Sequence, residues 1–347
     1  MKRRVLCVLT NYPTLSQTYK DSEIRYLTAG HEIQIVSFLP PHKRFGSAFP
    51  FQAVTRHSEV AEVAKAFRPD VLHGHYLHTS DVLHQMSEAI GVPFTIRSHS
   101  FDILGRSDEH ISRYAQHINS DRCLGLLAFP FLRETLVRCG IADSKIQDAW
   151  PVVDFDRFYD RSANGTGIMN TGACIPKKNM NSFVDLARMM PEQKFRMFPI
   201  GYESDALKAY NEAAGSPVDV RPVLEPCNMP FVYKRHQWLV YTANPDMPTI
   251  GWPLSIAEAQ ASGVGVLVHR VREDLRDYVG PGGFVYDTLE EARDILSQPL
   301  HPAARDASFE HARRSDIKIN LADLIRLWEA GPLLPRRRKS SESPVSA

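Results

Sequence analysis

The feature that constrains this chain most is a repeated alternation of short apolar strands with helical segments. The first unit runs from a strand at residues 5–9 through a helix at about 18–29 to a strand at 33–38. Further strands are predicted at residues 69–73, 93–97 and 123–128, with helices at 58–67, 81–90 and 131–139. This alternation is typical of a doubly wound α/β domain, in which ligands bind at the carboxyl ends of parallel strands.

A second alternating series follows residues 151–167, a stretch without clear periodicity that is the best candidate for a linker. Strands are predicted at 168–171, 194–200, 218–223 and 238–242, and helices at 180–190, 205–214 and 229–235, followed by apolar or helical segments at 275–279, 283–286 and 289–297. Two Rossmann-like halves joined by one linker would leave a cleft between them, and such clefts are preferred ligand sites.

The helical pattern at residues 311–328 has no partner left in the second series, so we expect it to pack back on the first domain. The end of the chain, with the basic run Arg336, Arg337, Arg338 and Lys339, is expected to be disordered. The predicted domains are therefore 1–160, 161–305, a returning helix at 306–334, and a tail at 335–347.

Residues 249–268 (TIGWPLSIAEAQASGVGVLV) predict a loop, a helix from Leu254 to Ala261, and a buried strand. Ser255 or Thr249 could cap the first free amides of this helix. Glu258 is its one carboxylate, in small or apolar company. Because an unpaired buried charge is costly, Glu258 requires a polar partner, and a bound polar ligand is one candidate.

Charge and cysteine content narrow the class of protein. Lys and Arg number 41 against 40 for Asp and Glu, which gives no reason to propose nucleic acid as a partner. No apolar run approaches the roughly 20 residues of a membrane span. The 5 cysteines are widely spaced and odd in number. They are typical of buried thiols in a reducing compartment, so the cytoplasm is the expected location.

Four motifs together resemble the retaining glycosyltransferases of family 4, which have the GT-B fold. Residues 170–179 (NTGACIPKKN) are similar to a strand and loop of that family that bind the donor diphosphate, and residues 251–263 to the second half of its Glu-x7-Glu motif. Residues 12–19 (YPTLSQTY) with Glu23, and residues 30–33, are similar to its acceptor-side loop and helix. Val153 and Asp154, with Phe158, resemble its inter-domain turn. The likeness covers about residues 5–328.

The resemblance implies an α/β protein in which a nucleotide-diphosphate sugar binds the second domain and a hydroxyl acceptor binds the first. Donor-binding residues would be Gly172, Lys177, Lys178, Leu254, Ser255 and Glu258. Lysines in a turn before a helix suit a diphosphate, and a carboxylate suits ribose hydroxyls. With lysines and helix amides on the leaving group, no metal or other cofactor is expected.

The resemblance also implies a catalytic role for His99, which ends a predicted strand and would approach the donor sugar and the reacting phosphate. The plainer interpretation is a loop histidine that caps the next helix. Acceptor-binding residues would be Tyr12, Thr14, Ser16, His75 and Asp102. The spacing of His73, His75 and His78 invites a metal site, but no carboxylate or Cys stands at ligand spacing nearby, which favours polar core or acceptor-pocket roles.

Two positions depart from the family pattern. Ile250 stands where the first Glu of the motif is expected, and Ala173 stands where an Arg usually accompanies the loop Lys. The leading hypothesis is retaining sugar transfer to a glycan, lipid-linked glycan or small molecule. The alternatives are a catalytically silent binding or partner protein of the same fold and a nucleotide-sugar epimerase. The basic tail could contact acidic lipid headgroups at the inner membrane face, or it could be simply solvated. The oligomeric state is left open.

Overall fold

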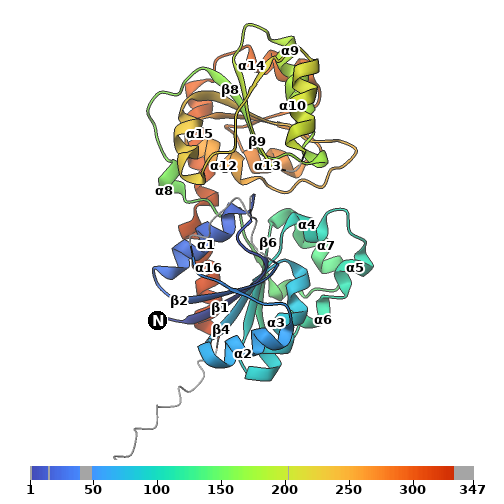
Figure 1. The fold of residues 1–347 in the computed structure, drawn as a ribbon, viewed down its shortest axis with the longest axis vertical. Helices are drawn as coiled ribbons and strands as arrows, with labels where there is room; N and C mark the ends of the chain where they lie inside the picture. The colour runs from blue at the N-terminus through green and yellow to red at the C-terminus, as the bar shows by residue number, and fades with distance from the viewer. Residues whose placement is uncertain (1, 15, 40–48, 202, 332–347) are drawn as a thin grey trace, which may run out of the picture.

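The computed structural model describes residues 2–14, 16–39, 49–201 and 203–331, which form two α/β domains joined end to end (Figure 1). The predicted disordered tail and its basic run lie outside the described residues. In the described part of the chain, no helix combines the length and apolar character that crossing a bilayer requires.

The first domain contains a parallel sheet of seven strands in the order β3-β2-β1-β4-β5-β6-β7. The strands are β1 (Arg4–Asn11), β2 (Glu32–Leu39), β3 (Gln52–Ala53), β4 (Val71–His75), β5 (Phe94–Arg97), β6 (Cys123–Ala128) and β7 (Ile146–Asp148). The helices are α1 (Thr18–Thr28), α2 (His57–Phe67), α3 (Ser80–Ile90), α4 (Ser100–Ile103), α5 (Asp108–Ser112), α6 (Ala115–Ile118) and α7 (Arg133–Arg138). β7 and the short helices α4 to α6 were not predicted, because segments of three to five residues carry little periodicity.

The second domain contains a parallel sheet of six strands in the order β10-β9-β8-β11-β12-β13. The strands are β8 (Gly167–Ala173), β9 (Phe195–Ile200), β10 (Val218–Val220), β11 (His236–Tyr241), β12 (Gly265–His269) and β13 (Phe284–Tyr286). The helices are α9 (Asn181–Met189), α10 (Ser204–Ala213), α11 (Met229–Lys234), α12 (Leu254–Ala261), α13 (Asp274–Val279), α14 (Leu289–Leu296) and α15 (Pro302–Ala312).

The strand order of each sheet reverses at one place. In the first sheet β1 separates β2 from β4, and in the second β8 separates β9 from β11. Loops that leave the carboxyl ends of such strands diverge and open a crevice where ligands bind. The loops after β1 and β4, and those after β8 and β11, are therefore the places where a site is expected.

The C-terminal part differs from the prediction of a single helix at 311–328. Two helices, α15 and α16 (Ile317–Ala330), are separated by a turn at Arg313–Ser315. The turn is held by the linker, since Val153 N donates to Ser315 O (2.8 Å) and Ile317 N donates to Val153 O (2.8 Å). α15 packs on α12 of the second domain, so the predicted boundary at residue 306 falls inside α15.

Helix α16 returns to the first domain and packs against α1 and β6 (Figure 1). Leu321, Leu324 and Trp328 are buried in one cluster with Val5 and Leu127 of the first sheet. Each such side chain contributes roughly 1.5–3 kcal/mol when fully buried. The predicted α/β class, with two Rossmann-like domains and a C-terminal helix that returns to the first, is confirmed.

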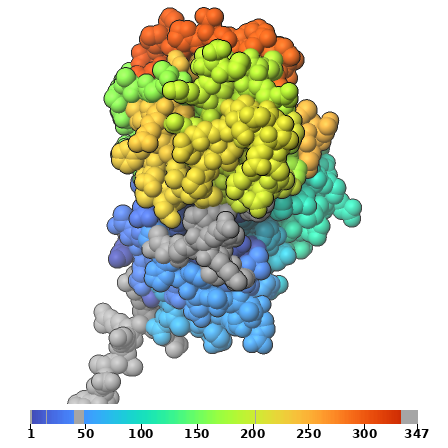
Figure 2. All heavy atoms as spheres, turned by 45° about the horizontal axis from the view of Figure 1, so that its top comes forward, coloured from blue at the N-terminus to red at the C-terminus, as the bar shows by residue number. Residues whose placement is uncertain are grey.

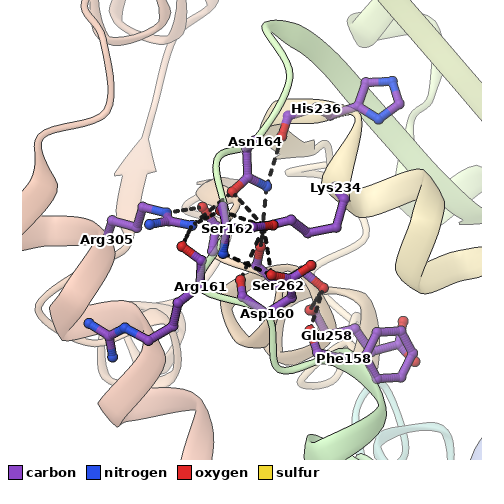
Figure 3. A network of polar contacts seen from close by, with 11 residues as sticks. Phe158, Asp160, Arg161, Ser162, Asn164, Lys234, His236, Glu258, Ser262 and Arg305 are labelled. Carbon is purple, nitrogen blue, oxygen red and sulfur yellow. Dashed lines mark hydrogen bonds and ion pairs between the residues drawn. The ribbon is translucent and has the colours of Figure 1, made fainter.

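The predicted linker is not a free connection. Figure 3 shows residues 160–164 held against the C-terminal end of α12 by two cations. Lys234 Nζ donates to Ser162 O (2.7 Å) and Asp160 O (3.1 Å), and Arg305 Nη2 donates to Ser162 O (2.6 Å). Ser262 Oγ donates to Phe158 O (3.1 Å). This segment therefore belongs to the second domain, which leaves residues 149–158 to cross between the domains.

The cysteines follow the prediction with one exception. Cys7, Cys123, Cys139 and Cys174 are buried, whereas Cys227 is exposed. Cys227 lies in the short helical turn Pro226–Asn228, which precedes α11 at the surface.

Candidate active site

A cavity of ≈ 350 Å³ lies between the two domains at the carboxyl ends of both sheets. Its first-domain wall follows α1, β5 and β6, and its second-domain wall follows β8, β11 and α12. Figure 2 shows the yellow and green segments of the second domain in contact with the blue and teal segments of the first. A ligand in this cavity would therefore touch both domains.

The turn after β8 places two lysines in the cavity wall. The chain leaves β8 at Ala173, and the helical turn Pro176–Lys178 ends at Asn179 in a left-handed conformation (φ 42°). Asn244 N donates to Lys177 O (3.0 Å), and Thr242 Oγ1 donates to Lys178 O (2.7 Å). These bonds tie the turn to the segment that follows β11, so the lysine positions are fixed by the sheet.

Gly172 is required for the Lys178 side chain to lie where it does. Its φ of +127° is rarely adopted by residues with a side chain, and a Cβ there would lie 2.3 Å from Lys178 Nζ. The glycine thus opens the space that the Lys178 ammonium occupies, over the ring of Tyr241 (5.2 Å to the centroid).

Both lysines lack an anionic partner among the residues that the structure describes. Lys177 Nζ donates to Thr249 O (3.1 Å), and no carboxylate of the described chain forms an ion pair with either lysine. Burial, together with the charge of Lys177, lowers the pKa of Lys178 from 10.5 to about 8. Burial and the nearby Arg272 lower the pKa of Lys177. Two uncompensated cations in a cavity wall constitute a site for an anion.

Helix α12 begins at the same cavity with free backbone amides. Its N-cap residue is Pro253, which offers no side-chain hydrogen bond to the first turn. The predicted caps were wrong, because Ser255 lies inside the helix and Thr249 lies four residues before Pro253. Leu254 and Ser255 both line the cavity. An uncapped helix N-terminus carries partial positive charge and binds anions, so α12 adds to the potential of the lysines.

Glu258 faces the cavity one turn further along α12. Its required polar partner is Tyr233 of α11, whose hydroxyl donates to Glu258 Oε2 (2.8 Å). Burial raises the pKa of Glu258, and the Tyr233 bond and Arg157 oppose the shift. One partner leaves the carboxylate with capacity to accept further hydrogen bonds, as a diol would supply.

His99 lies in the opposite wall, on the first domain, directly after β5. Its ring contacts the rings of Tyr19 and Tyr76, each 4.6 Å away between centroids. Burial, followed by the neighbouring His75 and Arg97, holds the pKa of His99 well below its ordinary value. His99 is therefore a neutral imidazole at neutral pH.

The acceptor-side candidates fall into two groups. Ser16 lines the cavity, but Thr14 does not, and Tyr12 lies in the core of the first domain with its hydroxyl on Asp21. His75 and Asp102 lie behind the wall and not in it. His75 Nδ1 is 3.0 Å from His99 Nε2, and the Asp102 carboxylate accepts from the backbone N–H groups of His99 and Leu77.

Gly251 and Trp252 bring the domains together beside the cavity. A Cβ on Gly251 would lie 2.5 Å from Ser100 Oγ of the first domain, so only glycine permits this approach. Trp252 is buried between two aromatic rings. It stacks on Tyr278 with 4.9 Å between ring centroids, and its ring centroid lies 4.7 Å from that of Trp150, a residue of the linker. The aromatic contact is structural, and it fixes the loop that precedes α12.

Two residues of the site, Arg97 and Tyr233, were not predicted as functional, and a third, Glu23, was quoted only as part of the acceptor-side motif. Arg97 lines the cavity, Tyr233 orients Glu258, and Glu23 lies behind His75. A charge at the end of a buried strand or on the apolar face of a helix was a signal for Arg97 and Glu23. No sequence signal marked Tyr233, because its role depends on a helix 25 residues away from it in the chain.

Two Rossmann-like domains with a cavity between their strand ends, and a last helix that returns to the first domain, define the GT-B fold of glycosyltransferases. No protein-family model and no curated protein sequence matches the chain. Among solved structures, the chain is similar to Anabaena Alr3699/HepE in complex with UDP and glucose, with a TM-score of 0.76 at 12% identity over 95% of this chain and 100% of that one.

It is also similar to a glycosyltransferase from Rickettsia africae, with a TM-score of 0.71 at 14% identity over 94% of this chain and 98% of that one. Sucrose-phosphate synthase from Thermosynechococcus elongatus gives a TM-score of 0.69 at 13% identity over 94% of this chain and 98% of that one. At these identities the likeness establishes the fold.

Proposed function

We propose that the protein is a glycosyltransferase that takes a sugar from a nucleotide-diphosphate sugar and transfers it to a hydroxyl acceptor. The observation that carries this proposal is the pair Lys177 and Lys178, which line the same cavity as an uncapped helix N-terminus and have no anionic partner in the described chain. A diphosphate is the anion that fits between two ammonium groups and a row of backbone amides. The UDP and UDP-glucose complexes of Alr3699/HepE, which shares the fold, support this choice of ligand.

In this proposal the second domain holds the donor. Lys178 and the amides of Leu254 and Ser255 neutralise the leaving diphosphate, and Glu258 accepts hydrogen bonds from the ribose hydroxyls. Lysine and amide charge can stabilise the developing negative charge without a metal ion, so we propose metal-independent transfer. Transfer with retention, as in family 4, is proposed on the motif resemblance.

The first domain would present the acceptor. Ser16 and the rings of Tyr19 and Tyr76 line its wall, with His99 between those rings. Exclusion of water by the two domains would protect the donor from hydrolysis. In this proposal the acceptor is defined only by its chemical class, as a molecule with a free hydroxyl group.

The test is a calorimetric titration with UDP, GDP, ADP and dTDP and with their glucose conjugates, in the presence of EDTA. We expect one nucleoside diphosphate to bind and its binding to be weakened in Lys178→Met. The anomeric configuration of the transfer or hydrolysis product, read by proton NMR, tests retention. Failure of every nucleotide to bind would remove the proposal.

A second candidate is a catalytically silent nucleotide-sugar-binding protein of the same fold. It rests on Ile250 and Ala173, two apolar side chains in the cavity wall at positions where the family carries Glu and Arg. Prolonged incubation with the nucleotide sugar that binds separates the two candidates, because a transferase releases free sugar by slow hydrolysis and a silent protein does not.

A further inference from the structure

A buried ionic cluster lies directly behind His99. The Glu23 carboxylate of α1 accepts from Arg97 Nε (2.9 Å) and is 2.9 Å from His73 Nε2 and 3.5 Å from His75 Nε2. All four side chains are at most 6% exposed. Burial by itself would raise the pKa of Glu23, but Arg97, His75 and His73 outweigh it and hold the pKa well below its ordinary value. Glu23 is therefore a carboxylate anion.

Glu23, His73 and His75 also satisfy the spacing of a metal site, since one ligand atom of each lies within 4.8 Å of the others. The Arg97 guanidinium at 2.9 Å already supplies the positive charge that Glu23 needs. A metal ion would have to share the carboxylate with that cation at close range, which is strongly unfavourable in a buried site. The cluster is better explained as a fixed network of hydrogen bonds.

The direction of each hydrogen bond can be followed from Trp328. Trp328 Nε1 only donates, so Thr95 Oγ1 accepts from it (2.9 Å) and has its own hydrogen left for His73 Nδ1 (2.8 Å). His73 then presents its Nε2–H to the Glu23 carboxylate, which only accepts. The Glu23 carboxylate is therefore held by His73, which is itself fixed by Thr95 and Trp328.

The same donor and acceptor rules show which ring nitrogen carries hydrogen in His75 and in His99. Burial lowers the pKa of His75 to about 4, and His99 is also neutral, so each ring carries one hydrogen. His75 Nε2 faces the carboxylate and must bear that hydrogen, which leaves the His75 Nδ1 lone pair to accept from His99 Nε2 (3.0 Å). At the other end the backbone of His99 is held by Asp102, since His99 N donates to the Asp102 carboxylate (3.0 Å) and Asp102 N donates to His99 O (3.0 Å). The reverse tautomers would set the lone pair of His75 Nε2 against the Glu23 carboxylate.

We propose that Glu23 is a positioning residue that acts through His75 and holds His99 in the neutral tautomer with hydrogen on Nε2. His99 Nδ1 then carries a lone pair, so toward a ligand the ring can accept a hydrogen bond and cannot donate one. Resting on the proposed function, this assigns His99 to a hydroxyl group of the sugar or the acceptor, and not to an oxygen of the departing phosphate.

The test needs no substrate. Ring ¹⁵N and ¹H correlation spectra of the full-length protein labelled at its 14 histidines distinguish the two neutral tautomers and the charged ring directly. Resonances of His75 and His99 are assigned by their loss in His75→Asn and His99→Asn. We expect Nε2–H on both residues at neutral pH in the unliganded wild type. Hydrogen on His99 Nδ1, or a charged His99, would overturn the proposal even if nucleotide binding is as proposed.

Two variants test the role of Glu23 itself. In Glu23→Gln the amide oxygen faces the Arg97 donor and the NH₂ group faces the histidines, so we expect His75 and His99 to move to the Nδ1–H tautomer. Glu23→Asp keeps an acceptor-only carboxylate, so we expect both rings to keep the wild-type tautomer. Circular dichroism tests whether each variant is folded. If a variant does not fold, the spectrum of the wild type still shows which tautomer His75 and His99 adopt.

Asp81→Asn is the matched control. It removes an exposed carboxylate 3.0 Å from His117 in the same domain, and we expect a change at His117 and none at His75 or His99. Unchanged His75 and His99 tautomers in Glu23→Gln would contradict a positioning role for Glu23.

Discussion

The buried ammonium of Lys178 predicts a conflict between stability and ligand binding that one substitution can reveal. In Lys178→Met a chain of similar length stays in place and the charge is removed. Because the described chain supplies no carboxylate to that charge, we expect the unliganded variant to be more stable than the wild type and to bind nucleotide more weakly. An ordinary structural lysine would show the opposite change in stability.

The magnitude follows from the pKa of the ammonium group. A fall from 10.5 to about 8 on folding corresponds to about 3 kcal/mol that the folded state loses by carrying the charge. Methionine gives up the contact of the cation with Tyr241, worth about 0.5–1 kcal/mol. The expected gain in the free energy of unfolding at pH 7 is therefore about 2 kcal/mol. Loss of a charge-assisted bond to phosphate, about 1.5–3 kcal/mol, should weaken binding by roughly 10- to 150-fold.

The direction in which the stability difference between the wild type and Lys178→Met changes with pH provides a second check. Between pH 8 and 10.5 the unfolded chain holds the Lys178 proton more tightly than the folded protein does, so the wild type gains stability from this group as pH rises through that window. The advantage of Lys178→Met should therefore be full below pH 8 and shrink toward pH 10.5.

Urea unfolding of both proteins across that pH range, with and without the nucleoside diphosphate that binds, measures these effects. Lys208→Met is the control, because Lys208 is an exposed lysine paired with Asp205 on α10, and its loss should change stability by less than about 0.5 kcal/mol and leave binding unchanged. The reasoning is refuted if Lys178→Met is less stable than the wild type at pH 7, or if it binds nucleotide equally well.

Three further substitutions test other parts of the structure. Gly172→Ala should strain the backbone at a φ of +127° and displace the Lys178 ammonium, so we expect a loss of about 1 kcal/mol or more in stability together with weaker nucleotide binding, measured by calorimetry. Tyr233→Phe removes the hydrogen bond to Glu258 and should raise the pKa of that carboxyl further, so nucleotide affinity should begin to fall at a higher pH than in the wild type as the solution is acidified; identical pH profiles would contradict this. Trp328→Ala should cost about 3–5 kcal/mol of unfolding free energy, because α16 belongs to the core of the first domain; a loss below about 1 kcal/mol would show that the helix is dispensable.

The longer strands of both sheets could be predicted because each depends on a local pattern. An apolar run flanked by turn residues was sufficient for β4, β5 and β6, and the helix prediction at Leu254–Ala261 matches α12. The break between α15 and α16 could not be predicted, because it depends on a bridge between Val153 and Asp316, which are distant in the chain. The cap of α12 was predicted wrongly, because nearby hydroxyl residues were taken as caps and the chain uses Pro253.

The candidate site also contains residues that the sequence predicted and residues whose placement it could not predict. Gly172, Lys178 and Glu258 were predicted because they lie in contiguous motifs, and the structure places all three on one cavity. The placement of Tyr12 in the core shows the limit of the motif, since a residue of the same loop can point toward the sheet or toward the ligand.

What the sequence determined is therefore the longer helices and strands and the residues whose chemistry suits a nucleotide sugar, since these are properties of short stretches of chain. Tertiary structure alone decided which charges are compensated. Glu23 meets His73 across 50 residues and Arg97 across 74, whereas Lys178 meets no carboxylate in the described chain. The energy of a buried charge depends on distances to groups that the fold brings near, and for that reason one buried cation is part of a closed network and the other remains available to bind an anion.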